Sequence, residues 1–295
     1  MTDIARTAEI PVDLPPRTGR ARTFRRSASG MTGLVLVVVL ALIALASVLK
    51  LWPYDPLAQD PVVRFQGPSG DHWFGTDQFG RDVFSRVAAG VANSALVAVV
   101  AVAVATVIGT VAGMFAGFFR GVTDGAVGAV TNVLFAFPPL LLALCLASVF
   151  DRTWFTVAVA IAVVYVPIFV RVTRGPVLTL REIDFVRAAR STGQGPVSTI
   201  FRHILPNIAP LLIVQVTLSL SWAVLTEASL SFLGLGTPPP APSLGSMIYE
   251  ARTLVTLAPW TMIAPGVVVV LLVVGLNLLG DGLRDTVDTR GGGTR

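Results

Sequence analysis

The sequence predicts an all-α integral membrane protein with six transmembrane helices and both termini in the cytoplasm. Of its 295 residues, 54% are hydrophobic and only 13% are charged, which is about half the charged fraction of an ordinary soluble domain. Uncharged runs of membrane length recur along the chain, and the positive charges gather in alternate segments between them. Helices are expected because an open backbone finds no hydrogen-bond partner in lipid.

Six stretches between charged residues are long enough to cross a bilayer, which takes about 20 apolar residues. They hold 23, 33, 26, 18, 24 and 28 uncharged residues, so only the fourth is short. The predicted spans are 27–49, 93–117, 127–149, 154–171, 208–230 and 259–280. The N-terminal tail, residues 1–26, has no apolar periodicity and is predicted to be disordered.

Prolines and glycines inside the spans predict kinks and close packing. Prolines lie inside several of them, among them Pro138, Pro139, Pro167 and Pro265. Membrane helices tolerate such residues as kinks. Gly109, Gly113 and Gly117 recur every four residues on the second span. That spacing lets another helix approach closely, although chance is the alternative in a chain with 27 glycines.

The arginine distribution predicts the orientation. Residues 1–30, 117–126, 171–203 and the tail 281–295 lie on one side of a six-span chain and carry 16 of its 22 Lys and Arg residues. The other side, with the extracytoplasmic loops 50–92 and 231–258, carries only six. The positive-inside rule therefore places both termini in the cytoplasm. The net charge of +5 is explained by this topology and predicts no nucleic-acid partner.

Neither a metal site nor an ATP site is predicted. Cys145 is the only cysteine, so no intrachain disulfide is possible. The two histidines, His72 and His203, fall on opposite sides of the predicted membrane. The sequence GTDQFGRD (75–82) has the glycine spacing of a phosphate-binding loop, but Arg81 and Asp82 replace its Lys and Ser/Thr. Those two groups hold the phosphates and Mg²⁺ in such loops, so any energy source must lie on another chain.

A polar insert, residues 172–207, interrupts the apolar sequence on the cytoplasmic side. Thr179 and Glu182 have the spacing of a capping box at a helix start. An apolar stripe at helical spacing follows: Phe185, Val186, Ala188 and Ala189. Gly193, Gly195 and Pro196 are expected to end this helix and begin a second one, because proline suits a first helical turn. A second apolar cluster precedes Pro206: Ile200, Phe201 and Ile204.

The residue pattern leaves two interpretations of this helix pair open. A small alanine face at the membrane surface suits docking into a groove on another protein. Alternatively, the segment is an amphipathic surface loop without a partner.

The insert resembles the "EAA" loop of permease subunits of bacterial ABC importers. That motif is Glu-Ala-Ala, three residues, Gly, nine residues, Ile, one residue, Leu-Pro. Its matching positions here are Ala188, Ala189, Gly193, Leu205 and Pro206. Arg187 stands in place of the motif's Glu, and His203 in place of its Ile. A histidine before Ile-Leu-Pro-Asn is similar to the peptide/nickel branch of these permeases.

The resemblance extends over most of the chain. Four further segments are similar to that branch: HWFGTDQFGRDVFSR (72–86), EASLSFLGLGTPPPAPSLGSM (227–247), APWTMIAPG (258–266) and NLLGDGLRDTVD (277–288). Together they resemble the second, or "C", permease of dipeptide and oligopeptide importers. The family often has Arg and Asp where this chain has Ala129 and Asn132, so no charge-based role is carried onto those positions.

The resemblance implies a type I ABC importer permease fold and a set of partners. These are a homologous "B"-type permease, one or two cytoplasmic ATP-binding subunits carrying ATP and Mg²⁺, an extracytoplasmic peptide-binding protein, and membrane lipid. The chain itself would hold no cofactor and no metal and would catalyse no reaction. Residues 184–206 would couple it to the ATPase, with these candidate contacts: Asp184, Arg187, Ala188, Ala189, Gly193, His203, Leu205 and Pro206.

Other charged residues are candidates for partner contacts. Glu227 lies near the outer end of the fifth span, where a carboxylate either faces the pore or a partner or simply ends the helix. A second group lies in the first outer loop: Asp77, Arg81, Asp82 and Arg86. Their spacing allows an i,i+4 ladder on a short surface helix. The main role of that ladder would be to fold the loop. Its secondary role would be to contact the peptide-binding protein.

Three rival functions remain at this stage. A membrane enzyme would need a nucleophile–base pair or metal ligands, and no HExxH or Asp-rich motif is present. A structural or receptor membrane protein would leave the EAA-like spacing without a purpose. An importer of nickel or another small solute would share the same architecture, because the binding protein largely sets selectivity in such systems.

Overall fold

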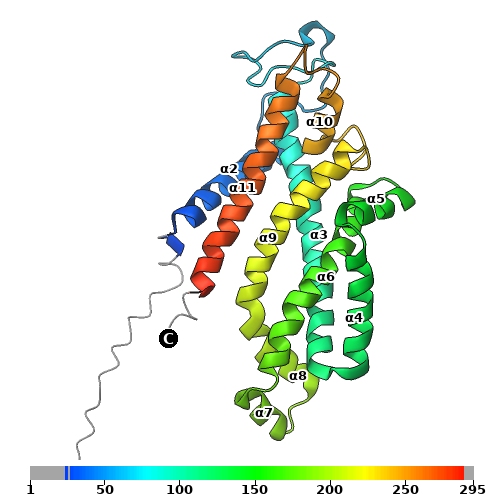
Figure 1. Ribbon diagram of the computed structural model, residues 1–295. Coiled ribbons are helices and arrows are strands. Elements are labelled where there is room, and N and C mark those ends of the chain that lie inside the picture. Colours follow the sequence, from blue (N-terminus) through cyan, green and yellow to red (C-terminus); the bar gives the residue numbers. More distant parts are fainter. Residues whose placement is uncertain (1–23, 26, 289–295) are drawn as a thin grey trace, which may run out of the picture.

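The computed structural model describes residues 24–25 and 27–288, and most of the tail predicted to be disordered lies outside this range, as do residues 289–295. The described part is helical, with one isolated β-bridge between Thr76 and Asp82 (Figure 1). The helices are α2 (Ala28–Val48), η1 (Pro61–Val63), α3 (Val83–Phe119), α4 (Gly121–Ala136), α5 (Pro139–Val149), α6 (Trp154–Leu180), α7 (Asp184–Ser191), α8 (Pro196–Thr199), the π-helical η2 (Ile200–Ile204), α9 (Leu205–Phe232), α10 (Leu244–Ala251) and α11 (Trp260–Asp288).

Five helical stretches are long and apolar enough to cross a membrane. They are α2, α3, α6, the continuous stretch from α8 through α9 (Pro196–Phe232) and α11. A sixth crossing is possible if α4 and α5, which are bent by 94° relative to each other, form one broken span. The chain is thus an all-helical, multi-pass membrane protein with five or six crossings.

The break between α4 and α5 differs from the single kinked span expected at 127–149. Phe137 and Pro138 both adopt extended backbone angles, with ψ of 138° and 128°. Two consecutive prolines remove two backbone donors, and a proline also disfavours helical angles in the residue before it. Pro167 and Pro265 are isolated and lie inside continuous helices. A single proline is thus accommodated within a continuous helix here, whereas two in succession coincide with the break.

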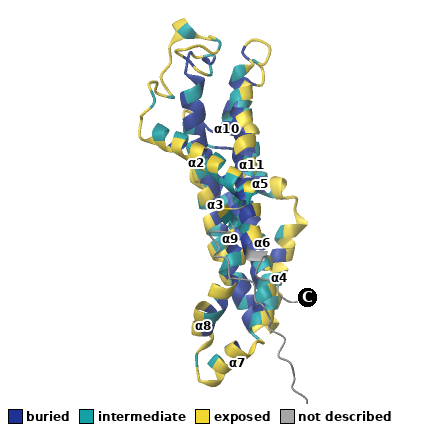
Figure 2. Cartoon of the chain, turned by 90° about the vertical axis from the view of Figure 1, so that its left-hand side faces the viewer, coloured by how far each residue is buried: buried dark blue, intermediate teal, exposed yellow. Residues whose placement is uncertain are grey.

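The core of the bundle is the long contact between α3 and α6. A Cβ atom on Gly109 would lie 2.5 Å from the Cβ of Phe169, and one on Gly113 would lie 2.6 Å from the Val170 carbonyl oxygen. The glycine repeat therefore does allow another helix to approach, and that helix is α6. Burial follows this seam, because Phe169 and Ala105 are fully buried (Figure 2).

Helix α2 packs mainly on α11 and to a lesser extent on α3. The contact is made where Gly33 meets the backbone of Leu279 and where Gly30 meets Gly282. Much of the rest of α2 is apolar and exposed, for example Leu42 with 59% of its surface accessible. Such a surface suits lipid or another membrane chain.

The polar segments gather at opposite ends of the bundle. The loop before α3 and helix α10 lie at one end, and α7 and α8 lie at the other (Figure 1). The α7–α8 end is largely exposed in the single chain (Figure 2). Because the two candidate partner regions lie at opposite ends of the bundle, each could contact a different aqueous compartment.

Candidate functional site

The polar insert folds as two short helices, as expected, but its first helix begins later than the capping box predicts. Thr179 lies in the last turn of α6, which runs to Leu180. The N-cap of α7 is Ile183, whose side chain makes no capping hydrogen bond. The capping-box prediction is wrong because α6 continues through the site, so Thr179 and Glu182 do not flank a helix start.

The turn between the two helices agrees with its sequence. Gly193 has a φ of +85°, a left-handed conformation that glycine adopts without steric cost. Pro196 occupies the first turn of α8. Helix α8 then passes without a break through the π-helical η2 into α9. The second half of the insert, α8 and η2, is therefore part of the same helical stretch as the membrane span α9.

Three apolar side chains anchor the insert to the bundle. Val186 on α7 and Ile200 and Ile204 on η2 are each 0% exposed. The other apolar residues predicted for the stripe and the cluster are more open, with Phe185 43% and Phe201 44% exposed. The insert thus holds its position through one face and leaves the other available.

The eight candidate coupling residues divide by exposure. Five are exposed, namely Asp184, Arg187, Ala188, Gly193 and Pro206, and three are half-buried, namely Ala189, His203 and Leu205. The exposed members form a patch with no cover in the single chain. The structure therefore brings the motif residues to one end of the bundle without showing what they contact.

His203 joins the two halves of the insert. One of its ring nitrogens, Nε2, lies 2.9 Å from Oε1 of Gln194 in the turn after α7. The same Gln194 donates from Nε2 to the hydroxyl of Ser198, at 2.8 Å. Asn207 donates to the His203 carbonyl oxygen at 2.6 Å. These bonds fix the turn against η2, the π-helical segment that precedes α9.

Glu227 is fully buried on α9, at 0% exposure. The hydroxyl of Ser231, one turn later, donates to its Oε1 at 2.6 Å. Oε2 has no hydrogen-bond partner among the described residues, although the hydroxyls of Ser94 and Ser243 face the carboxylate. Glu227 therefore lies inside the protein, between α9, α3 and the start of α10, and does not end the helix in the interface.

The charged residues of the first outer loop form a compact network with α10. Arg81 contacts Asp77 at 2.6 Å, and its Nη2 contacts Oε2 of Glu250 at 2.9 Å. Arg86 reaches the same Glu250 oxygen at 3.2 Å and Asp77 at 3.6 Å. Asp77, Arg81 and Arg86 are all buried. The network fastens the outer loop to α10 and leaves these side chains little surface for a docked protein.

The predicted i,i+4 ladder is formed only in its first half. Asp77 and Arg81 do pair, although they lie in a turn and not on a helix. Asp82 instead caps α3, accepting from the backbone N–H of Ser85 at 2.8 Å, and pairs with Nδ1 of His72 at 2.9 Å. Arg86 lies inside α3, whose start at Val83 is ten residues before the expected start of the span at 93. The cap explains the early start, because aspartate is a favoured N-cap residue.

Two charged contacts were missed at the sequence level. Glu250 is the centre of the outer network, yet its partners lie more than 160 residues away in the sequence. Asp124 on α4 and Arg174 on α6 form a two-bond ion pair, at 2.5 and 2.7 Å. The only available signal was that Asp124 and Arg174 each lie within a few residues of a predicted span, where an unpaired charge is costly.

Two known protein families match this chain, each over a different part of it. Residues 109–291 match the family described as "Binding-protein-dependent transport system inner membrane component". Residues 19–68 match the family described as the N-terminal TM domain of oligopeptide transport permease C.

Individual relatives match over nearly the whole chain. The "Dipeptide transport system permease protein DppC" of Alkalihalophilus pseudofirmus is 39% identical over 91% of this chain and 88% of its own length. The "Glutathione transport system permease protein GsiD" of Shigella flexneri is 41% identical over 91% of this chain and 89% of its own length. The protein of the same name from Escherichia coli is 39% identical over the same shares.

The first family match covers more than half of the chain, including α6 to α11 and the insert between α6 and α9. The relatives are well above the identity at which family membership is secure, and they cover both ends of the bundle. The chain therefore belongs to the family of inner-membrane components of binding-protein-dependent transport systems, as a permease of the C type.

Proposed function

We propose that this chain is the C-type permease of an ATP-driven importer for dipeptides and oligopeptides. It lies in the bacterial cytoplasmic membrane with both termini in the cytoplasm. The names of its relatives support the peptide substrate, because a dipeptide and glutathione are both short peptides. The arginine bias of the sequence supports the orientation.

The observation that carries the proposal is the continuity of the insert with a membrane span. The exposed residues of α7 lie at one end of the bundle, and α8, η2 and α9 form one helical stretch from Pro196 to Phe232. A partner that moves the insert would therefore move a whole span with it. Permeases of this family act with other subunits, and here ATP and Mg²⁺ would be held by one or two cytoplasmic ATP-binding subunits.

The mechanism is a bundle with two states, biased by partners that bind one state better. A "B"-type permease would complete the pore, and an extracytoplasmic peptide-binding protein would deliver the solute to the outer end. Closure of the ATPase subunits on ATP would shift the insert. The chain itself would perform no chemistry and would transmit force by contact.

A crosslinking and uptake experiment tests this function. Ala189→Cys is introduced in a Cys145→Ala background, and cysteines are placed along the groove of the ATPase encoded beside this chain. A nucleotide-dependent crosslink, with uptake of a labelled dipeptide by the unsubstituted transporter, is the expected result. No crosslink at any position, or no peptide uptake by the assembled complex, contradicts the proposal. Uptake of nickel in place of peptide would assign the same architecture to a different solute.

The turn glycine supplies a matched pair of variants for this experiment. Gly193→Arg places a large side chain at a φ of +85° and should abolish uptake. Gly193→Asn keeps a residue that tolerates the left-handed conformation and should retain most of it. Equal uptake in the two variants would show that the turn is not part of the coupling contact.

A further inference from the structure

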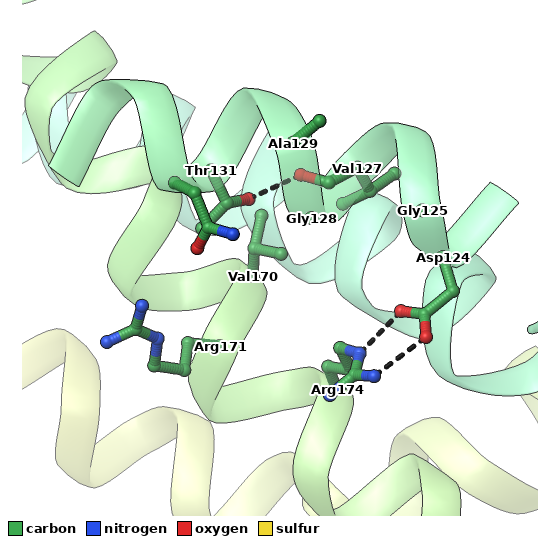
Figure 3. Close-up of a pocket in the computed structure, with 10 residues that line it drawn as sticks. Asp124, Gly125, Val127, Gly128, Ala129, Thr131, Val170, Arg171 and Arg174 are labelled. Atoms are coloured by element: carbon green, nitrogen blue, oxygen red, sulfur yellow. Dashed lines mark hydrogen bonds and ion pairs between the residues drawn. The ribbon is translucent and has the colours of Figure 1, made fainter. Parts of the chain in front are cut away.

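A cavity of about 570 Å³ lies between α4 and α6 (Figure 3). Its volume is in the range of small-molecule sites. Several of its lining residues, including Gly125, Ala129, Asn132 and Arg171, are exposed in the single chain, so the cavity opens on the surface of the bundle.

The cavity exists because α4 presents small residues to α6. Gly125, Gly128 and Ala129 line it, and a Cβ atom on either glycine would meet nothing within 4 Å. These glycines therefore differ from Gly109 and Gly113, against which the neighbouring helix α6 packs closely. The space beside Gly125 and Gly128 stays open.

The charges around the cavity do not balance. Arg174 is neutralised by Asp124 through two hydrogen bonds. Arg171, nearly one helical turn earlier on α6, has no carboxylate within ion-pair distance among the described residues. Figure 3 shows its guanidinium directed away from the Asp124–Arg174 pair. The cavity thus carries one uncompensated positive charge.

The donors of Arg171 are available to a ligand. Within residues 27–288 its guanidinium makes one ring contact, with Phe135, at 4.2 Å from the guanidinium carbon to the ring centroid. A ring contact of this kind orients the guanidinium without engaging its N–H groups as an ion pair would. The amide of Asn132, also in the cavity lining, makes no hydrogen bond with the described residues and adds a second polar group.

The position of Arg171 at the end of the predicted fourth span, on an exposed face of α6, leaves it open to water or a ligand. It lies nine residues before the end of α6 at Leu180, or about 14 Å along the helix axis. Charged residues within a span almost always face a bundle interior or a water-filled cavity.

We propose that this cavity binds the carboxylate of the transported solute, with Arg171 as the anion-binding residue. This rests on the peptide import proposed above. A planar guanidinium can accept a carboxylate through two parallel hydrogen bonds, and one uncompensated charge matches one carboxylate. The free C-terminus of a peptide supplies that group, and the remaining volume accommodates its adjoining residues. A lipid phosphate offers similar chemistry and is separated from the peptide by the experiment.

The first measurement tests the charge of the cavity. Ala129→Cys is placed in the cavity, in a Cys145→Ala background, within the assembled transporter. Its labelling rates are compared for two methanethiosulfonates, one carrying a sulfonate and the other a trimethylammonium group. Arg171→Gln is expected to lower the anion-to-cation rate ratio about fivefold or more, because a positive charge lining a cleft raises the local concentration of the anionic reagent and lowers that of the cationic one. Arg152→Gln, an exposed charge outside the cavity, is the matched control and should leave the ratio unchanged. An unchanged ratio in Arg171→Gln overturns the proposal.

The second measurement identifies the anion. The assembled permeases and ATPases carrying Ala129→Cys, without the binding protein, are incubated with a millimolar dipeptide that has either a free or an amidated C-terminus. The free dipeptide is expected to protect the introduced thiol from labelling, the amidated form to protect it several-fold less, and Arg171→Gln to remove the difference.

Equal protection by both forms, or by neither while peptide uptake persists, overturns this inference but leaves the proposed function intact. Protection by phosphatidylglycerol but not by peptide assigns the site to lipid and also overturns it. Failure of peptide uptake itself would instead overturn the proposed function.

Discussion

Arg86 and Glu250 lie 164 residues apart in the sequence, and Nη2 of the arginine lies 3.2 Å from Oε2 of the glutamate. The contact ties the first turns of α3 to α10, and Arg81 shares the same carboxylate oxygen at 2.9 Å. One acid on a short helix therefore holds two arginines of the first outer loop and the helix that follows it. This carboxylate is thus a shared partner for two arginines at this end of the bundle.

Glu250→Gln is expected to destabilise that outer end. The substitution leaves Arg81 and Arg86 with Asp77 as their only carboxylate, and the loss of charge-assisted hydrogen bonds costs about 2 kcal/mol. The Tm of the purified transporter should fall, and protease cleavage in the loop 50–82 should speed up. Asp71→Asn removes the same charge from an exposed position of that loop and should change neither quantity. Equal behaviour of the two variants would contradict this role of Glu250.

Gly109→Ala and Gly113→Ala are expected to disturb the packing of α3 on α6. Each added methyl group would meet α6 at 2.5–2.6 Å, and overpacking of this kind costs about 1–3 kcal/mol. The thermal unfolding midpoint and the yield of assembled transporter should both fall. Gly266→Ala is the matched control, because Gly266 is also inside a helix and a Cβ there would meet nothing within 4 Å. A control variant as unstable as the other two would rule out the packing explanation.

Gln194 and His203 are expected to act as one unit. Either alanine substitution breaks their 2.9 Å hydrogen bond and frees the turn from η2, so uptake should fall several-fold while ATP hydrolysis continues. Substitutions in contact are non-additive, so the double variant should lose no more uptake than either single variant. Ser191→Ala, which removes only a hydroxyl bonded to its own helix, should leave transport intact. Additive losses in the double variant would show that the two side chains act separately.

The Glu227–Ser231 pair predicts a rescue. Glu227→Leu leaves the buried Ser231 hydroxyl without its acceptor and should cost about 1–3 kcal/mol. Adding Ser231→Ala removes the stranded hydroxyl, and stability should partly return, because replacing both partners by apolar groups can be nearly neutral. Ser229→Ala on the same helix, whose hydroxyl bonds only its own backbone, is the control. Further loss of Tm in the double variant would mean that Glu227 has a role beyond this pair.

The apolar pattern was enough to locate most of the helices. The expected starts at 27, 154 and 259 lie within one residue of the starts of α2, α6 and α11. The pattern works because lipid demands long uncharged helices, a constraint that acts on every residue of a span. The family resemblance, carried by residues such as Ala188 and Gly193, then identified the permease class.

The parts that the sequence could not predict depend on distant partners or on competing local signals. Nothing near Arg86 in the sequence points to its half-buried carboxylate partner, Glu250, which lies 164 residues further along the chain. Thr179 and Glu182 had capping-box spacing, but the preceding helix runs on to Leu180 and the next helix begins only at Asp184. The open cavity beside Arg171 has no linear signal at all, because it is defined by the glycines of another helix.

The unbroken helix from Pro196 to Phe232 holds 37 residues, a rod of about 55 Å in a hydrocarbon layer of about 30 Å. Both ends of the helix therefore extend beyond the hydrocarbon layer, and the helix would pivot near the middle of the membrane. Rocking the rod by about 10° moves each tip by about 5 Å, in opposite directions, given this length. A push on the tip at Pro196 would move the far tip, beside Glu227, in the opposite direction. A single rocking motion of this helix would therefore widen one end of a pore while it narrows the other end.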